Sequence, residues 1–69
     1  MEQIKTVTLQ SVDYFSEVLA SKTNKATKDE IQHNVVSFLS EKGNKMFVEF
    51  YNDTFSSKNF EGAVKILNI

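Results

Sequence analysis

The chain has 69 residues, no cysteine and a net charge of −1, from nine acidic side chains and eight lysines. A chain of this length forms one domain, residues 1–69, and without cysteine it has neither a disulfide nor a thiolate ligand for a metal. The balanced charge and the absence of arginine argue against a protein that reads DNA through phosphate and guanine contacts.

The first 22 residues hold no apolar run long enough for a signal peptide or a membrane span, so we expect a cytoplasmic protein. Proline is absent, whereas Lys, Asn, Phe and Ser are frequent. This composition is typical of AT-rich coding sequences and favours a bacterial, phage or mobile-element origin. Apolar residues make up 41% of the chain, which is enough for a core.

Three polar breaks divide the chain into four segments, and the first segment allows two structures. One broad helical arc carries Ile4, Val7, Val12, Phe15, Val18 and Leu19, which predicts a helix over about 3–21. The run "IKTVTL" is rich in β-branched residues and favours a strand at 3–9 instead. That strand would need 45–51 or 63–69 as its partner.

The second segment has the clearest helical pattern. Thr27 and Glu30 have the spacing of a capping box, in which each side chain accepts from the other residue's backbone N–H. One helical face then carries Ile31, Val35, Phe38 and Leu39. Gly43 provides a stop. We predict a helix over about 28–42.

The third segment opens with "NKMFVEFYND", residues 44–53. As a strand it would place polar side chains on both faces. As a helix it has an apolar side opposite a polar stripe of Lys45, Glu49, Asn52 and Asp53. The helical period separates the residue types, so we predict a helix over about 44–55 in spite of the β-propensity of Phe, Val and Tyr.

The last segment, "KNFEGAVKILNI", has the same period, and Ser57 is its expected N-cap. The last two helices form a predicted hairpin that is locally similar to a tetratricopeptide-type pair, with matching offsets at Phe47, Phe50, Ala63 and Leu67. Tyr51 stands where that family has a small residue, and only one unit is present, so no function follows from the similarity.

We therefore expect an all-α protein, a small bundle of about four helices. The alternative is an α+β fold with strands at about 3–9, 45–51 and 63–69 around a central helix. Tyr14 and Tyr51 are expected at the edge of the core, where their hydroxyls reach water.

Few residues have the chemistry of a catalytic or metal site. His33 is the only imidazole, and Asp29, one turn earlier, could orient it. No second histidine and no cysteine is present, so we expect no metal site. The only glycines are Gly43 and Gly62, which excludes a glycine-rich phosphate loop. We expect a protein that is not an enzyme and has no cofactor and no small-molecule substrate.

Lys22, Lys25 and Lys28 cluster around the first polar break, and phosphate contacts from them would make a weak nucleic-acid binder. A helix-turn-helix built from the second and third helices would present Glu49 and Asp53 to DNA, which is the wrong charge. Nucleic acid is therefore the secondary expectation for a partner.

Five apolar or small residues lie outside the apolar helix faces: Leu9, Val36, Gly62, Ile66 and Ile69. Gly62, one turn before Ile66, would allow a second helix to approach closely. Such residues predict a packing surface for another protein or for a second copy of the chain. We expect a protein-interaction module that binds stoichiometrically, as a regulator or inhibitor of a larger protein.

Overall fold

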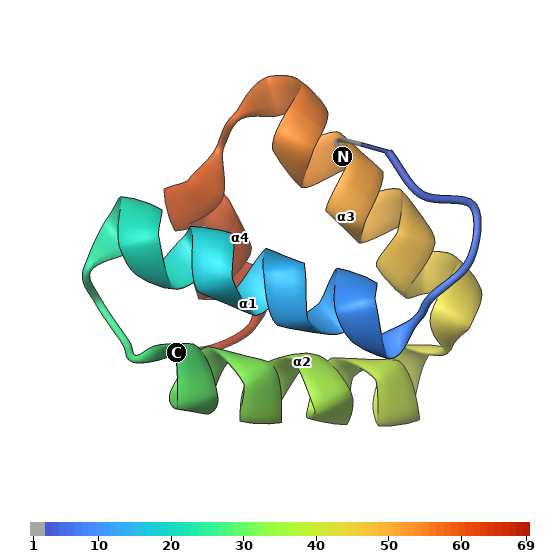
Figure 1. The fold of residues 1–69 in the computed structure, drawn as a ribbon, viewed down its shortest axis with the longest axis horizontal. Coiled ribbons are helices and arrows are strands. Elements are labelled where there is room, and N and C mark those ends of the chain that lie inside the picture. The colour runs from blue at the N-terminus through green and yellow to red at the C-terminus, as the bar shows by residue number, and fades with distance from the viewer. Residues whose placement is uncertain (1–2) are drawn as a thin grey trace.

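The computed structural model describes residues 3–69 and contains four α-helices, which confirms the expected all-α bundle. In Figure 1, α1 (Leu9–Thr23) and α2 (Lys28–Lys42) run antiparallel, α3 (Asn44–Ser57) lies at an angle to both, and α4 (Phe60–Ile66) lies behind α1. No strand occurs between residues 3 and 69, so the α+β alternative is wrong.

Side chains from all four helices meet in one core, whose centre is aromatic. Phe15 is fully buried. Its ring centroid lies 5.3 Å from those of Phe47, Phe50 and Tyr51 and 5.9 Å from that of Phe55. The other buried apolar residues are Val12, Leu19, Ile31, Val35, Ala63, Val64 and Leu67. Each of these lies on an apolar face that the helical period predicts.

Tyr51 lies in this centre and not at its edge, so that expectation is wrong. It is fully buried, because it shares the inward face of α3 with Phe47 and Phe55. Burial raises the pKa of its hydroxyl above the usual value of 10.0. Tyr14 does lie at the edge, 36% exposed and stacked on Phe55.

The first helix begins at Leu9, so the predicted helical turns from residue 3 are wrong. Thr8 is the N-cap: its hydroxyl accepts from the Ser11 N–H at 3.1 Å, and the Ser11 hydroxyl accepts from the Thr8 N–H at 2.9 Å. This is a capping box with serine in the place of the usual Glu or Gln. The helix ends at Thr23, before Asn24 in the left-handed conformation.

Residues 3–8, here called the strap, run alongside α3 in the opposite direction (Figure 1). One side chain fastens the strap to the helix. The Asn52 side chain accepts from the Ile4 N–H at 2.8 Å and donates to the Ile4 carbonyl at 3.0 Å. The half-buried side chains of Ile4 and Val7 pack on the core. The strap therefore extends the core without being helical.

Replacing Asn52 with leucine is expected to loosen the strap and to lower the free energy of unfolding by about 1 kcal/mol, since two backbone groups of Ile4 lose their partner while water can still reach them. Hydrogen exchange measures this directly, because the Ile4 amide should lose protection while amides within α1 keep theirs. Unchanged exchange at Ile4 would contradict the role given to Asn52.

The capping box at α2 is present as predicted. The Thr27 hydroxyl accepts from the Glu30 N–H at 3.2 Å, and a Glu30 carboxylate oxygen accepts from the Thr27 N–H at 3.0 Å and from its hydroxyl at 3.1 Å. The bond from the Thr27 backbone, followed by that from its hydroxyl, lowers the pKa of Glu30 below its usual value of 4.5.

A lowered carboxyl pKa stabilises the fold above the unfolded-state pKa, and this contribution is lost as the pH falls through the folded-state pKa. We therefore expect Glu30→Gln, which keeps the capping geometry but does not titrate, to reduce the loss of stability below about pH 4.5. Urea titrations of both proteins at pH 7 and pH 3 measure the difference. An acid-limb slope that is equal in the two proteins would contradict it.

The end of α3 and the start of α4 differ from the prediction. α3 continues through Ser57, so this residue does not cap α4. Asn59 is the N-cap, and its side-chain oxygen accepts from the Gly62 N–H at 3.0 Å. After α4, the Asn34 side chain donates to the Leu67 carbonyl at 2.8 Å and ties the C-terminal segment to α2.

Candidate functional site

An open groove with apolar lining residues lies where α2, α3 and α4 meet. It has a volume of about 810 Å³. It is lined by Gln3 of the strap and by Phe38, Lys42, Met46, Glu49, Phe50, Asn52, Asp53, Ser56 and Ile66. We call this the α2–α3–α4 groove.

Two half-buried rings form the floor of the groove. Phe38 and Phe50 stack with centroids 5.0 Å apart and planes at 28°. Each ring also packs inward, Phe50 against Phe15 at 5.3 Å and Phe38 against Phe47 at 6.3 Å. The floor is therefore fixed by the core and does not need a partner to order it.

Above the floor stand two exposed apolar side chains, Met46 from α3 and Ile66 from α4. They are 49% and 62% exposed, respectively. Isolated apolar residues are ordinary on a protein surface, but these two line the same groove as a pair of half-buried rings, and together the four side chains make up its apolar patch. This arrangement can bind an apolar side chain or helix face.

The rim of the groove is charged. On α3, Glu49 and Asp53 lie one helical turn apart, and both are exposed. Lys42 at the end of α2 lines the groove as well. Within residues 3–69, the only ion pairs join Lys28 to Asp13 and Glu17, so none of the rim charges forms an ion pair in that part of the chain.

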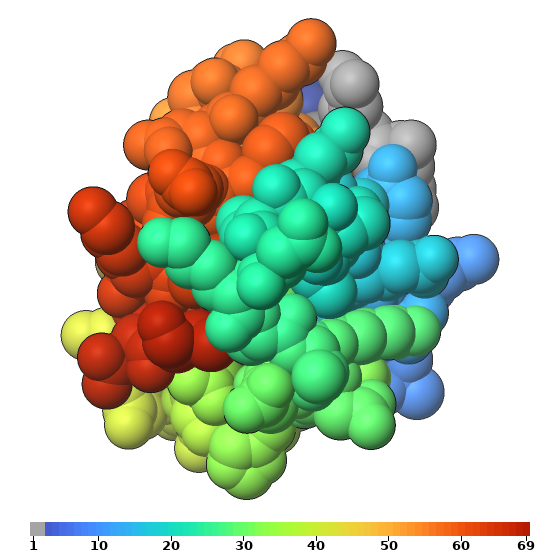
Figure 2. All heavy atoms as spheres, turned by 90° about the vertical axis from the view of Figure 1, so that its left-hand side faces the viewer, coloured from blue at the N-terminus to red at the C-terminus, as the bar shows by residue number. Residues whose placement is uncertain are grey.

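A neighbouring hollow of about 540 Å³ lies between the start of α2 and the C-terminal segment. His33 lines it with Asp29 and Ile69. The described part of the chain contains no group of three His, Cys, Asp or Glu side chains that could hold a metal ion. Figure 2 shows the C-terminal segment in red, lying over α2.

The structure separates the five residues predicted for partner binding. Ile66 lies in the α2–α3–α4 groove and Ile69 in the neighbouring hollow. Leu9 and Val36, both exposed, line neither of these two. At Gly62 the space that a Cβ would occupy is filled by the side chain of the cap, Asn59, whose Nδ2 would be 2.5 Å from it.

Three of the four apolar residues that line the groove were not assigned to a site by the sequence analysis. Phe38 and Phe50 lie on predicted core faces, and their half-burial depends on how the helices cross. Met46 was the only one with a signal in the sequence, since it stands next to the polar stripe of α3 and outside its apolar face.

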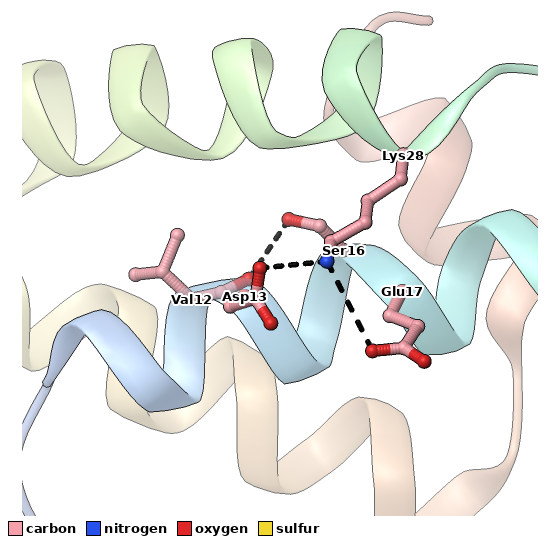
Figure 3. Close-up of polar contacts among 5 residues, drawn as sticks. All are labelled: Val12, Asp13, Ser16, Glu17 and Lys28. Carbon is pink, nitrogen blue, oxygen red and sulfur yellow. Dashed lines mark hydrogen bonds and ion pairs between the residues drawn. The ribbon is translucent and has the colours of Figure 1, made fainter.

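The three lysines predicted to contact phosphate differ in their surroundings. Lys28 donates to the Asp13 carboxylate at 2.7 Å and lies 4.0 Å from that of Glu17 (Figure 3). The hydrogen bond to Asp13 raises the pKa of Lys28 above its usual value of 10.5. Lys22 and Lys25 are exposed. Lys28 therefore already has acidic partners.

The groove and the bundle define the coarse class of this protein, a small helical domain with a surface groove lined in part by apolar side chains. Comparison with protein families, with curated proteins and with solved structures finds no significant match to this chain. No helix in the described part of the chain is both long and apolar enough to cross a membrane.

Proposed function

We propose that this protein is an interaction module that binds another protein stoichiometrically through the α2–α3–α4 groove. The observation that carries the proposal is the apolar patch itself. Met46 and Ile66 project beside the stacked rings of Phe38 and Phe50, which the core holds in place. Apolar anchors on a rigid base are the usual centre of a binding hot spot.

The energetics suit docking of a short element. Burying a fully exposed Met or Ile side chain contributes about 1.5–3 kcal/mol. Met46 and Ile66 are 49% and 62% exposed, so covering each of them contributes roughly half of this, before the cost of association is subtracted. A domain of 69 residues can occupy a site on a larger protein with this one face. A role as regulator or inhibitor, encoded by a phage or another mobile element, is consistent with such one-to-one binding.

Nucleic-acid binding through Lys22, Lys25 and Lys28 is the less favoured candidate. Its three phosphate contacts are reduced to two, because Lys28 pairs with Asp13. Each phosphate contact contributes about one unit to the slope of log affinity against log salt. A salt titration with single-stranded and duplex DNA tests this candidate separately.

The groove is tested by charge insertion. In the Met46→Asp/Ile66→Asp variant, partners bound by the wild type should bind about tenfold more weakly or be lost, since a buried carboxylate has no counterpart there. The matched control is Leu9→Asp/Val36→Asp, which alters exposed apolar residues outside the groove.

Affinity capture followed by titration calorimetry with the captured protein provides the measurement. Thermal unfolding should show both variants folded, because the four side chains are exposed. Equal affinity of the groove variant and the control for the captured protein would contradict the proposal.

A further inference from the structure

We infer that the occupant of the α2–α3–α4 groove is an amphipathic helix of another protein, with lysine or arginine on the flank that meets Glu49 and Asp53. This inference rests on the proposed function, and it specifies the chemistry of the partner. It depends on the shape of the groove, on its rim charges and on what the chain's own helices expose.

The shape of the groove suits a helix. Along α3 it is lined by Met46, Glu49, Phe50, Asp53 and Ser56. This stripe covers ten residues of rise, about 15 Å, which is about three turns of a partner helix. Grooves between helices bind the apolar face of an amphipathic helix through anchors at i, i+3 or i+4, and i+7.

The charges on the rim of the groove determine which charged side chains the partner helix should carry. At 100° per residue, Phe50 lies next to the buried face of α3, whereas Glu49 and Asp53 lie further round, towards solvent. Two carboxylates one turn apart weaken their own helix, and neither forms an ion pair within residues 3–69. A basic residue on the partner would pair with them, while Lys42 would accept an acidic residue nearby.

A second copy of the chain does not provide such a helix. Within residues 3–69, the large exposed apolar side chains are dispersed: Leu9 and Tyr14 on α1, Val36 on α2, Met46 on α3, Ile66 on α4, and Ile69 beyond it. No helix presents three of them at i, i+3 or i+4, and i+7. No helix within residues 3–69 supplies the apolar stripe, so we assign it to a different protein.

The experiment uses a displayed library of 14-residue helices with leucine at positions 3, 6, 10 and 13. The positions beside this stripe are randomised among Lys, Glu and Gln, and the library is selected against the wild-type protein. We expect selected helices to carry lysine along one flank only. The best helix is then synthesised and titrated by fluorescence anisotropy.

Charge reversal locates the contact. Glu49→Lys/Asp53→Lys should weaken binding of the selected peptide about tenfold, and a peptide with glutamate in place of its flanking lysines should regain affinity for this variant. The control variant Glu17→Lys/Glu61→Lys changes the same net charge outside the groove and should have little effect.

The outcomes separate this inference from the proposed function. Selected helices with acidic or uncharged flanks, or binding that is insensitive to reversal at Glu49 and Asp53, would overturn the inference and leave the groove as a binding site. Binding that survives Met46→Asp/Ile66→Asp would overturn the groove itself. If light scattering detects a dimer that Met46→Asp/Ile66→Asp dissociates, the occupant is a second copy of the chain, and the inference is overturned. A library that yields no binder would overturn it as well.

Discussion

Replacing Phe15 with alanine is expected to lower the free energy of unfolding by about 3–5 kcal/mol, the range for truncating a buried phenylalanine. The ring is fully buried and packs against the rings of Phe47, Phe50, Tyr51 and Phe55. An aromatic pair contributes about 0.5–1.5 kcal/mol beyond the contribution of its buried apolar area, and the substitution by alanine removes several such pairs at once. Most of the stability of a small domain would be lost.

Urea denaturation followed by circular dichroism provides the measurement, with Leu9→Ala as the control on the same helix. Leu9 is 89% exposed, and its truncation should change the free energy of unfolding by no more than about 0.5 kcal/mol. A cost below about 1 kcal/mol for Phe15→Ala would show that the aromatic centre is not where the fold is stabilised.

The second large effect is expected at Gly43, where Gly43→Ala should cost about 1–3 kcal/mol. This residue joins α2 to α3 with φ 93° and ψ 166°, a region that is almost exclusive to glycine. A Cβ built there meets no other atom within 4 Å. The cost is therefore one of backbone strain and not of steric crowding.

Chemical synthesis offers a matched control for Gly43, because D-alanine has the mirror-image preference and tolerates positive φ. The D-alanine protein should be as stable as the wild type or more stable, since the added methyl group also restricts the unfolded chain. Equal stability of the L- and D-alanine proteins in thermal unfolding would contradict the assignment to backbone conformation.

Much of the fold was predictable because local signals and the hydrophobic period agreed. Thr27 and Glu30 marked the start of α2, and Gly43 marked its end. In residues 44–55 the 3.6-residue period outweighed the β-propensity of the aromatics, because burying one face of a helix contributes more than intrinsic preference.

The errors at the helix ends occurred where the residue that caps the helix was difficult to recognise. Ser11 at the third helical position does not match the usual Glu or Gln of a capping box, so the start of α1 at Leu9 was missed. Asn59 and Ser57 are both good N-caps, and only the length of α3 decides between them.

The candidate site was only partly predictable. Reasoning from side chains left outside the apolar faces identified Ile66, because a helical wheel shows what a single helix leaves exposed. It did not identify the groove, since Phe38, Phe50 and Ile66 come from three helices, and their proximity depends on how those helices cross.

The fastening of the strap by Asn52 has a consequence for how the sequence can vary among natural variants. The Asn52 side chain accepts one hydrogen bond and donates another, and both of its partners are main-chain atoms of Ile4. Residue 4 can therefore be any similar aliphatic residue without loss of these two bonds. Position 52 tolerates few replacements, because even aspartate lacks the N–H group that donates to the Ile4 carbonyl. Mutational scanning should accordingly find exchange among aliphatic residues tolerated at position 4, opposite a restricted asparagine at position 52.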